Sequence, residues 1–125
     1  MTQESDRDAR FDPGGAWRLA GRDAAGRELL LTIRQDELTN AYPGITFGRH
    51  PALCDRVIEE PSLSRRHFRL GRSAEGVTLE DLGSLNGTRL DGLALEPFVP
   101  VALADGQSIT AGRVTLTVSR LTQAD

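Results

Sequence analysis

Short runs of alternating apolar and polar residues, each closed by a turn, constrain the fold of this chain more than any other feature. The clearest run is Val114–Val118, in which three apolar residues alternate with two threonines. Alternation with a period of two predicts a strand that buries one face. No long stretch carries the sustained 3.6-residue apolar repeat of an amphipathic helix. The 13 glycines and 6 prolines are scattered among the runs, and turns this frequent imply short strands.

Apolar residues at every second position place the expected strands. These lie around Trp17–Ala20, Leu29–Ile33, Ile45–Phe47, Val57–Ile58, Phe68–Leu70, Val77–Leu82, Ile109–Ala111 and Val114–Val118. Asp-Gly pairs tolerate the positive φ of tight turns, so Asp91-Gly92 predicts a hairpin. The segment 35–44 is expected to be a loop, because Asn40 and Pro43 interrupt it. The pattern predicts an all-β fold, an antiparallel β-sandwich of about 10–11 short strands.

A chain of 125 residues has room for one domain with a core of its own. Residues 1–15 are polar and show no periodicity, so we expect an N-terminal tail, a β-sandwich domain over residues 16–121 and a short C-terminal tail over 122–125. The chain has no apolar stretch of membrane-spanning length and does not begin like a signal peptide. We therefore expect a soluble, cytoplasmic protein.

The charge of the chain narrows its possible partners. With 15 basic and 18 acidic residues, the net charge is −3, which argues against nucleic acid or an anionic membrane as the main partner. All the basic residues are arginine. Arginine counts alone therefore carry no functional inference, and only arginines within motifs do.

Three motifs occur where strand patterns meet turns. They are Gly48-Arg49, Ser64-Arg65-Arg66-His67 and Gly83-Ser84-Leu85-Asn86-Gly87-Thr88. A β-sandwich gathers its loops at its ends, so residues distant in sequence can converge. Two guanidinium groups, a hydroxyl and an amide on adjoining loops suit the capture of a phosphate group, which offers several acceptor oxygens.

In this order, the three motifs resemble the forkhead-associated (FHA) family of phosphothreonine-peptide readers, over roughly Phe11–Leu121. The resemblance implies an FHA/SMAD-like sandwich with its ligand loops clustered at one end. It also implies a non-catalytic module that binds phosphothreonine-containing proteins downstream of a Ser/Thr protein kinase. We expect a monomer that uses no cofactor and no metal.

The resemblance also assigns roles to individual residues. Arg49 is expected to bind the phosphate or the adjacent peptide, the Ser64 hydroxyl to donate to a phosphate oxygen, and Arg65 to act as a second phosphate donor. Asn86 is expected to hydrogen-bond the peptide backbone. The residues expected to support the loops are Gly48, His67, Ser84, Leu85, Gly87 and Thr88. Leu85 departs from the family, in which many members carry a threonine or serine donor there.

Several alternatives remain beside this interpretation. The chain could be a structural interaction module that docks its partners regardless of phosphorylation, and Leu85 favours that possibility. Phosphorylated Thr2 or Thr39 could enter the site of the chain itself or of a neighbour. Ser64 and His67 could suggest a nucleophile and a base, but no carboxylate has the context to orient the histidine. His50 with Cys54 could suggest metal binding, yet two further ligands are not evident.

Overall fold

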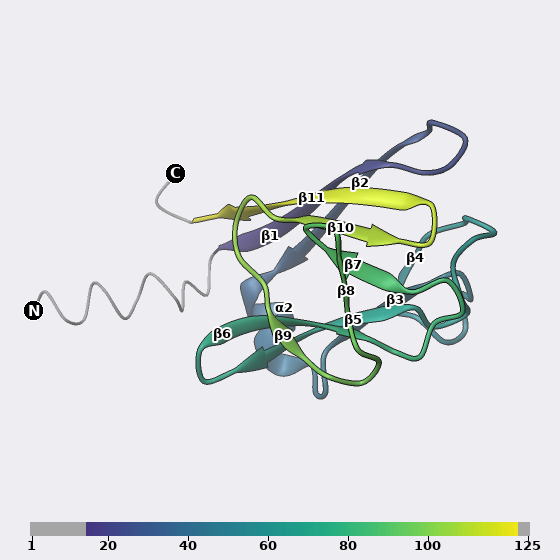
Figure 1. Cartoon of the computed structure of the whole chain (residues 1–125). Helices are drawn as coiled ribbons and strands as arrows, with labels where there is room; N and C mark the ends of the chain where they lie inside the picture. The colour runs from purple at the N-terminus through teal and green to yellow at the C-terminus, as the bar shows by residue number, and fades with distance from the viewer. Residues whose placement is uncertain (1–14, 123–125) are drawn as a thin grey trace, which may run out of the picture.

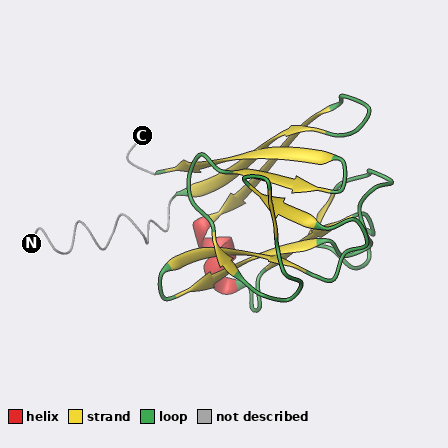
Figure 2. Cartoon of the chain, viewed as in Figure 1, coloured by secondary structure: helices red, strands yellow, loops and turns green. Residues whose placement is uncertain are grey.

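The computed structural model describes residues 15–122, which form two stacked β-sheets. In Figure 1 the sheet that contains β1, β2 and β11 lies above the sheet that contains β3, β5 and β6, and Figure 2 shows how strand dominates the chain. The first sheet has the order β2 (Glu28–Arg34), β1 (Ala16–Arg22), β11 (Val114–Leu121), β10 (Ser108–Ala111), β7 (Thr88–Leu90) and β8 (Leu93–Ala94). The second has the order β4 (Arg56–Val57), β3 (Ile45–Gly48), β5 (Phe68–Ser73), β6 (Gly76–Asp81) and β9 (Val101–Ala102).

The predicted all-β sandwich is therefore confirmed, with one difference in strand direction. The pairing of β3 with β4 is parallel, whereas the other strand pairs within residues 15–122 are antiparallel. The loop between β3 and β4 reverses the chain twice, so that β4 runs in the same direction as β3. Phe47 pairs with Arg56 across this short ladder.

The core lies between the sheets and follows the period-two pattern. In β11, Val114, Leu116 and Val118 are fully buried and the threonines between them are exposed. In the second sheet, the rings of Phe47 and Phe68 stack with their centroids 4.6 Å apart. Burying such apolar side chains is the main stabilising contribution in a domain of this size.

The expectation of a loop over residues 35–44 was wrong for its first half, which forms the helix α2 (Gln35–Asn40). The Glu37 carboxylate accepts a hydrogen bond from the Arg34 N–H, which stabilises the start of the helix. Leu38 is buried against the core. A helix of six residues is too short to show an apolar repeat, so the breakers Asn40 and Pro43 dominated the sequence pattern.

Of the two expected tails, residues 1–14 and 123–125 lie outside the described residues. Within the part of the chain that the structure describes, no helix is long and apolar enough to cross a membrane.

The loops that carry the three motifs lie at one end of the sandwich. They are the connections from β3 to β4, from β4 to β5 and from β6 to β7, on the right of Figure 1. The turn between β5 and β6 lies at the opposite end, on the left.

Candidate functional site

Hydrogen bonds join the three motif loops to one another. The backbone N–H of Arg49 donates to the carbonyl of Ser64 at 3.1 Å, and the N–H of Leu85 donates to the Ser64 hydroxyl at 2.9 Å. Gly48 allows the first two loops to approach closely, because a Cβ at this position would lie 2.3 Å from the Arg65 carbonyl oxygen. The three loops therefore form one connected surface.

Three arginines line a single depression on this surface. Arg49, Arg65 and Arg66 lie around it together with Ser64, and its remaining lining residues are Leu53, Gly83 and Leu85. The sequence analysis quoted Arg66 within its motif but gave it no role at this site. The depression thus has three arginines and a serine in its lining.

Arg49 is held in place by its own backbone surroundings. Its Nε donates to the Leu63 carbonyl at 2.9 Å. The side chain is exposed, and its terminal Nη groups have no hydrogen-bond partner among residues 15–122. Since Nε is fixed, the planar fork is partly preorganised and its two outer donors remain available to a ligand.

The Ser64 hydroxyl has its acceptor role filled and its donor role free. It accepts the Leu85 N–H at 2.9 Å, and a hydroxyl carries one proton of its own to donate. That proton can therefore serve an anion in the depression.

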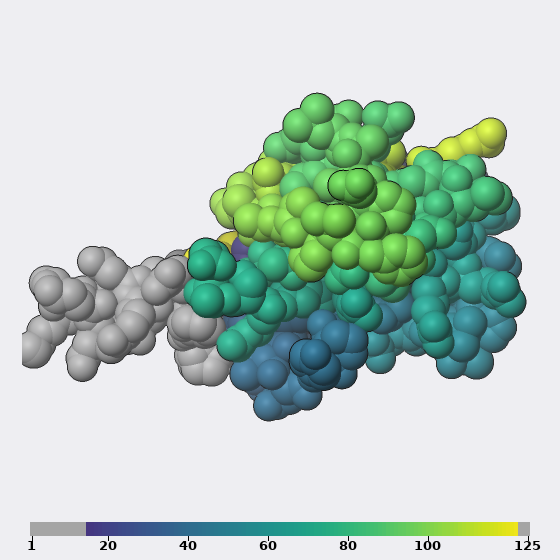
Figure 3. Space-filling model, turned by 60° about the horizontal axis from the view of Figure 1, so that its bottom comes forward, coloured from purple at the N-terminus to yellow at the C-terminus, as the bar shows by residue number. Residues whose placement is uncertain are grey.

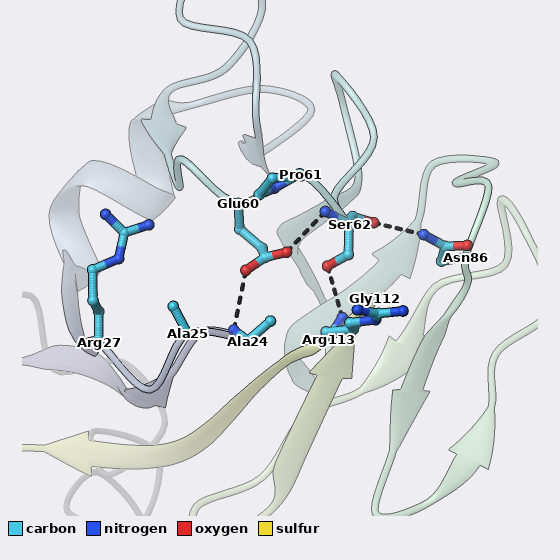
Figure 4. Close-up of a pocket in the computed structure, with 9 residues that line it drawn as sticks. All are labelled: Ala24, Ala25, Arg27, Glu60, Pro61, Ser62, Asn86, Gly112 and Arg113. Atoms are coloured by element: carbon cyan, nitrogen blue, oxygen red, sulfur yellow. Dashed lines mark hydrogen bonds between the residues drawn. The ribbon is translucent and has the colours of Figure 1, made fainter.

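Asn86 does not line this depression but a second pocket, which Figure 4 shows; its neighbour Leu85 lines the depression. The Nδ2 of Asn86 donates to the Ser62 carbonyl at 2.8 Å. The side chain is exposed, and its amide oxygen has no partner among the described residues, so it can accept a further N–H.

His67 is fully buried and connects two of the loops. Its Nδ1 accepts the Ser64 backbone N–H at 3.1 Å, so its proton resides on Nε2, which donates to the Gly87 carbonyl at 2.9 Å. Burial lowers the pKa of His67, and the hydrogen bond to Gly87 opposes this shift in part. The neutral ring makes the contacts expected of a residue that orders the loops.

Asp81, at the end of β6, is a residue that the sequence analysis missed. It is buried, and its carboxylate accepts four hydrogen bonds, from the N–H groups of Gly83 and Ser84 and from the hydroxyls of Ser84 and Thr88. The hydroxyl bonds measure 2.6 Å each. Asp81 therefore fixes the loop that carries Leu85 and Asn86. An aspartate two positions before a glycine turn is a signal for such a contact, but the sequence does not show that it is buried.

The pocket in Figure 4 contains a second buried carboxylate. Glu60 accepts the N–H groups of Ala24 at 3.0 Å and Ser62 at 2.8 Å. The Ser62 N–H is the main cause of a lowered pKa at Glu60. The Ser62 hydroxyl in turn accepts the Arg113 N–H at 2.9 Å. These contacts join the β1–β2 and β10–β11 turns to the segment that precedes Ser64.

His50 and Cys54 both lie in the loop between β3 and β4 and make hydrogen bonds to backbone groups. The Cys54 thiol donates to the Arg65 carbonyl at 2.8 Å, and burial raises the pKa of this thiol. His50 Nδ1 accepts the Ala52 N–H at 3.1 Å. The contacts of both residues are thus to backbone groups of the loops.

Comparison with known proteins agrees with this architecture. The family model described as FHA domain matches residues 45–112, which include all three motifs. The oxoglutarate dehydrogenase inhibitor of Corynebacterium diphtheriae is 30% identical over 109 residues, covering 82% of this chain and 73% of that protein. By contrast, the chain spans 22% and 20% of the length of two other relatives, from Arabidopsis thaliana and Homo sapiens.

Two solved structures share the fold. The FHA domain of an Arabidopsis thaliana hypothetical protein superposes with a TM-score of 0.70 at 27% identity, over 89% of this chain and 90% of that one. A structure from a study of phosphothreonine-dependent FHA domain interactions superposes with a TM-score of 0.61 at 24% identity, over 83% and 95%.

Two stacked sheets with three hydrogen-bonded loops at one end define a β-sandwich domain. With its motifs inside the matched region, this chain belongs to the FHA family.

Proposed function

We propose that this chain is a non-catalytic recognition module that binds phosphothreonine-containing protein segments in Ser/Thr kinase signalling. The observation that carries the proposal is the depression shared by Arg49, Ser64 and Arg65, to which Arg66 adds a third guanidinium group. One of the similar solved structures comes from a study of phosphothreonine-dependent FHA domain interactions.

The charge of the depression suits a phosphate monoester. A phosphothreonine carries about −1.5 to −2 charges at neutral pH and three strong acceptor oxygens. The Nη groups of Arg49 and the Ser64 proton are unused donors at the depression, and Arg65 and Arg66 are both exposed there. Arginine forks match the geometry of phosphate oxygens and stay charged at any physiological pH.

The amide oxygen of Asn86, unpaired among residues 15–122, supports a role for this residue in holding the peptide beside the phosphate. Because its Nδ2 is engaged by the Ser62 carbonyl, its oxygen is the group left to accept a backbone N–H of a bound peptide. An extended peptide offers such N–H groups at regular intervals.

The contacts of His67 argue against hydrolytic chemistry. A base must take the proton of the nucleophilic hydroxyl, but His67 Nδ1 accepts the backbone N–H of Ser64 instead. Its Nε2 is engaged by the Gly87 carbonyl, which belongs to another loop. Neither ring nitrogen is therefore available to the Ser64 hydroxyl.

Three or four charge-assisted hydrogen bonds at ~1.5–3 kcal/mol each give a gross ~5–12 kcal/mol. Ordering a flexible peptide removes several kcal/mol of this. At the upper end of this range, about 12 kcal/mol, such a cost leaves a net free energy of about −8 kcal/mol, which corresponds to a dissociation constant of about 1 μM.

A titration with matched peptides tests the proposal. Isothermal titration calorimetry with a threonine-containing peptide, phosphorylated or not, should give a dissociation constant near 1 μM for the phosphorylated form. The unphosphorylated form should bind at least about 100-fold more weakly, since it lacks the dianion. Equal affinities would instead identify the chain as a module that docks partners regardless of phosphorylation.

A further inference from the structure

Apolar side chains stand exposed beside the three arginines. Leu85 is 89% exposed and Leu53 is 37% exposed, and both line the same depression as the arginines. Phe98 is 64% exposed and lies beside Gly83, another lining residue of the depression, because a Cβ on Gly83 would lie 2.8 Å from the tip of its ring. We call Leu53, Leu85 and Phe98 the apolar wall.

The side chain of Leu85 does not pack in the hydrophobic core. Its backbone N–H holds the Ser64 hydroxyl, whereas the isobutyl group remains in water at an energetic cost. The loop that carries it is fixed on both sides, by Asp81 through Gly83 and Ser84 and by His67 through Gly87. A rigid loop thus presents the Leu85 side chain next to the arginines. Because the loop is already fixed, a ligand that buries this side chain pays little entropy for ordering the loop.

The occupant of this depression must combine an anionic group with an apolar one a few ångströms away. A phosphothreonine followed or preceded by a large apolar residue has this combination, because consecutive Cα atoms lie about 3.8 Å apart. The neighbouring pocket of Figure 4 differs in character, since charged Arg27, Glu60 and Arg113 line it. Leu85 and Asn86 are adjacent in sequence but line different pockets. A peptide that crosses them would meet an apolar surface on one flank of its phosphate and a polar surface on the other.

We propose that the apolar wall selects phosphopeptides with a large aliphatic or aromatic residue within two positions of the phosphothreonine, on one flank only. This inference rests on the proposed function and deepens it by naming the class of ligand. Leu85 then determines specificity by contacting the peptide.

A double-mutant cycle between protein and peptide tests the inference. The reference is a phosphothreonine peptide with serine at the two positions on each side, and four further peptides each carry one leucine at one of these positions. Leucine on one flank should tighten binding to the wild-type protein about five- to tenfold, the effect expected for burying part of an aliphatic side chain. Leucine on the other flank should change the affinity less than about twofold.

The variant Leu85→Ala should lose most of this preference, so that leucine on the favoured flank tightens its binding less than about twofold relative to the all-serine phosphopeptide. Alanine is chosen because serine would add a phosphate donor. The matched control is Leu93→Ala, since Leu93 is 75% exposed on β8 and does not line the depression. It should keep the full preference.

Three outcomes would overturn the inference. If the wild-type protein binds all five phosphopeptides equally, the apolar selection is refuted but the proposed function is not. The same holds if Leu85→Ala keeps the full preference for leucine. If no phosphopeptide binds while the protein is folded, the proposed function itself fails and the inference fails with it.

Discussion

Replacing Arg49 with alanine is expected to weaken phosphothreonine-peptide binding about 100-fold or more while leaving the domain folded. The substitution removes the outer donors of a fork that Nε already aligns against the Leu63 carbonyl. Two charge-assisted hydrogen bonds at ~1.5–3 kcal/mol each account for such a loss. The stability should fall only by about 1 kcal/mol, because one hydrogen bond within the protein is lost and the side chain is exposed.

Two further variants show whether the loss of affinity depends on the guanidinium fork and on the position of Arg49. Arg49→Lys keeps the charge but not the fork, so its affinity should lie between those of the wild-type protein and Arg49→Ala. Arg18→Ala removes an exposed arginine from β1, outside the motif loops, and should bind like the wild type. Calorimetric titration gives the affinities and thermal unfolding gives the stabilities. Wild-type affinity in Arg49→Ala would show that the phosphate, if bound at all, binds elsewhere.

Replacing Asp81 with alanine should lower the free energy of unfolding by about 3–5 kcal/mol. The substitution would remove the acceptor of four hydrogen bonds at a buried position. The donors of Gly83, Ser84 and Thr88 would then lack a partner, and an unsatisfied buried polar group costs roughly 1–3 kcal/mol. Since the same donors fix the loop of Leu85 and Asn86, peptide affinity should fall as well.

Urea unfolding at neutral pH measures this effect. Asp105→Ala is a suitable control, because Asp105 is exposed and accepts one hydrogen bond, from the Arg120 N–H; its cost should stay near 1 kcal/mol or below, about that of one exposed hydrogen bond. If Asp81→Ala unfolds within about 1 kcal/mol of the wild type, the four contacts do not hold the loop as described.

The sequence allowed the strands to be predicted where one face is buried and the other is not. The alternation in Val114–Val118 became β11, with its valines and leucine inside. Helix α2 escaped prediction because its six residues bury chiefly Leu38 and Gln35, which are too few to define a period. The parallel pairing of β4 with β3 could not be predicted either, because two residues are too few to show a pattern that indicates the partner strand or its direction.

The candidate site was predictable in its motif residues and not in the contacts that surround them. Arg49, Ser64 and Asn86 stand in recognisable motifs at strand ends, which is why they could be named. Asp81 and Glu60 were not named. Asp81 binds N–H groups two and three positions further along the chain, but its burial depends on the fold. Glu60 also binds the Ala24 N–H, which only the fold brings near. Single-sequence patterns record alternation and turns, but they do not record which carboxylate becomes buried.

Backbone amide signals followed by NMR during titration provide the most direct test of whether the loops act together on one phosphate. With the phosphorylated peptide, the largest changes should fall on Arg49, on residues 64–66 and on residues 85–87, and the unphosphorylated peptide should leave these signals in place. Changes centred on the turn between β5 and β6, at the far end of the sandwich in Figure 1, would contradict the account.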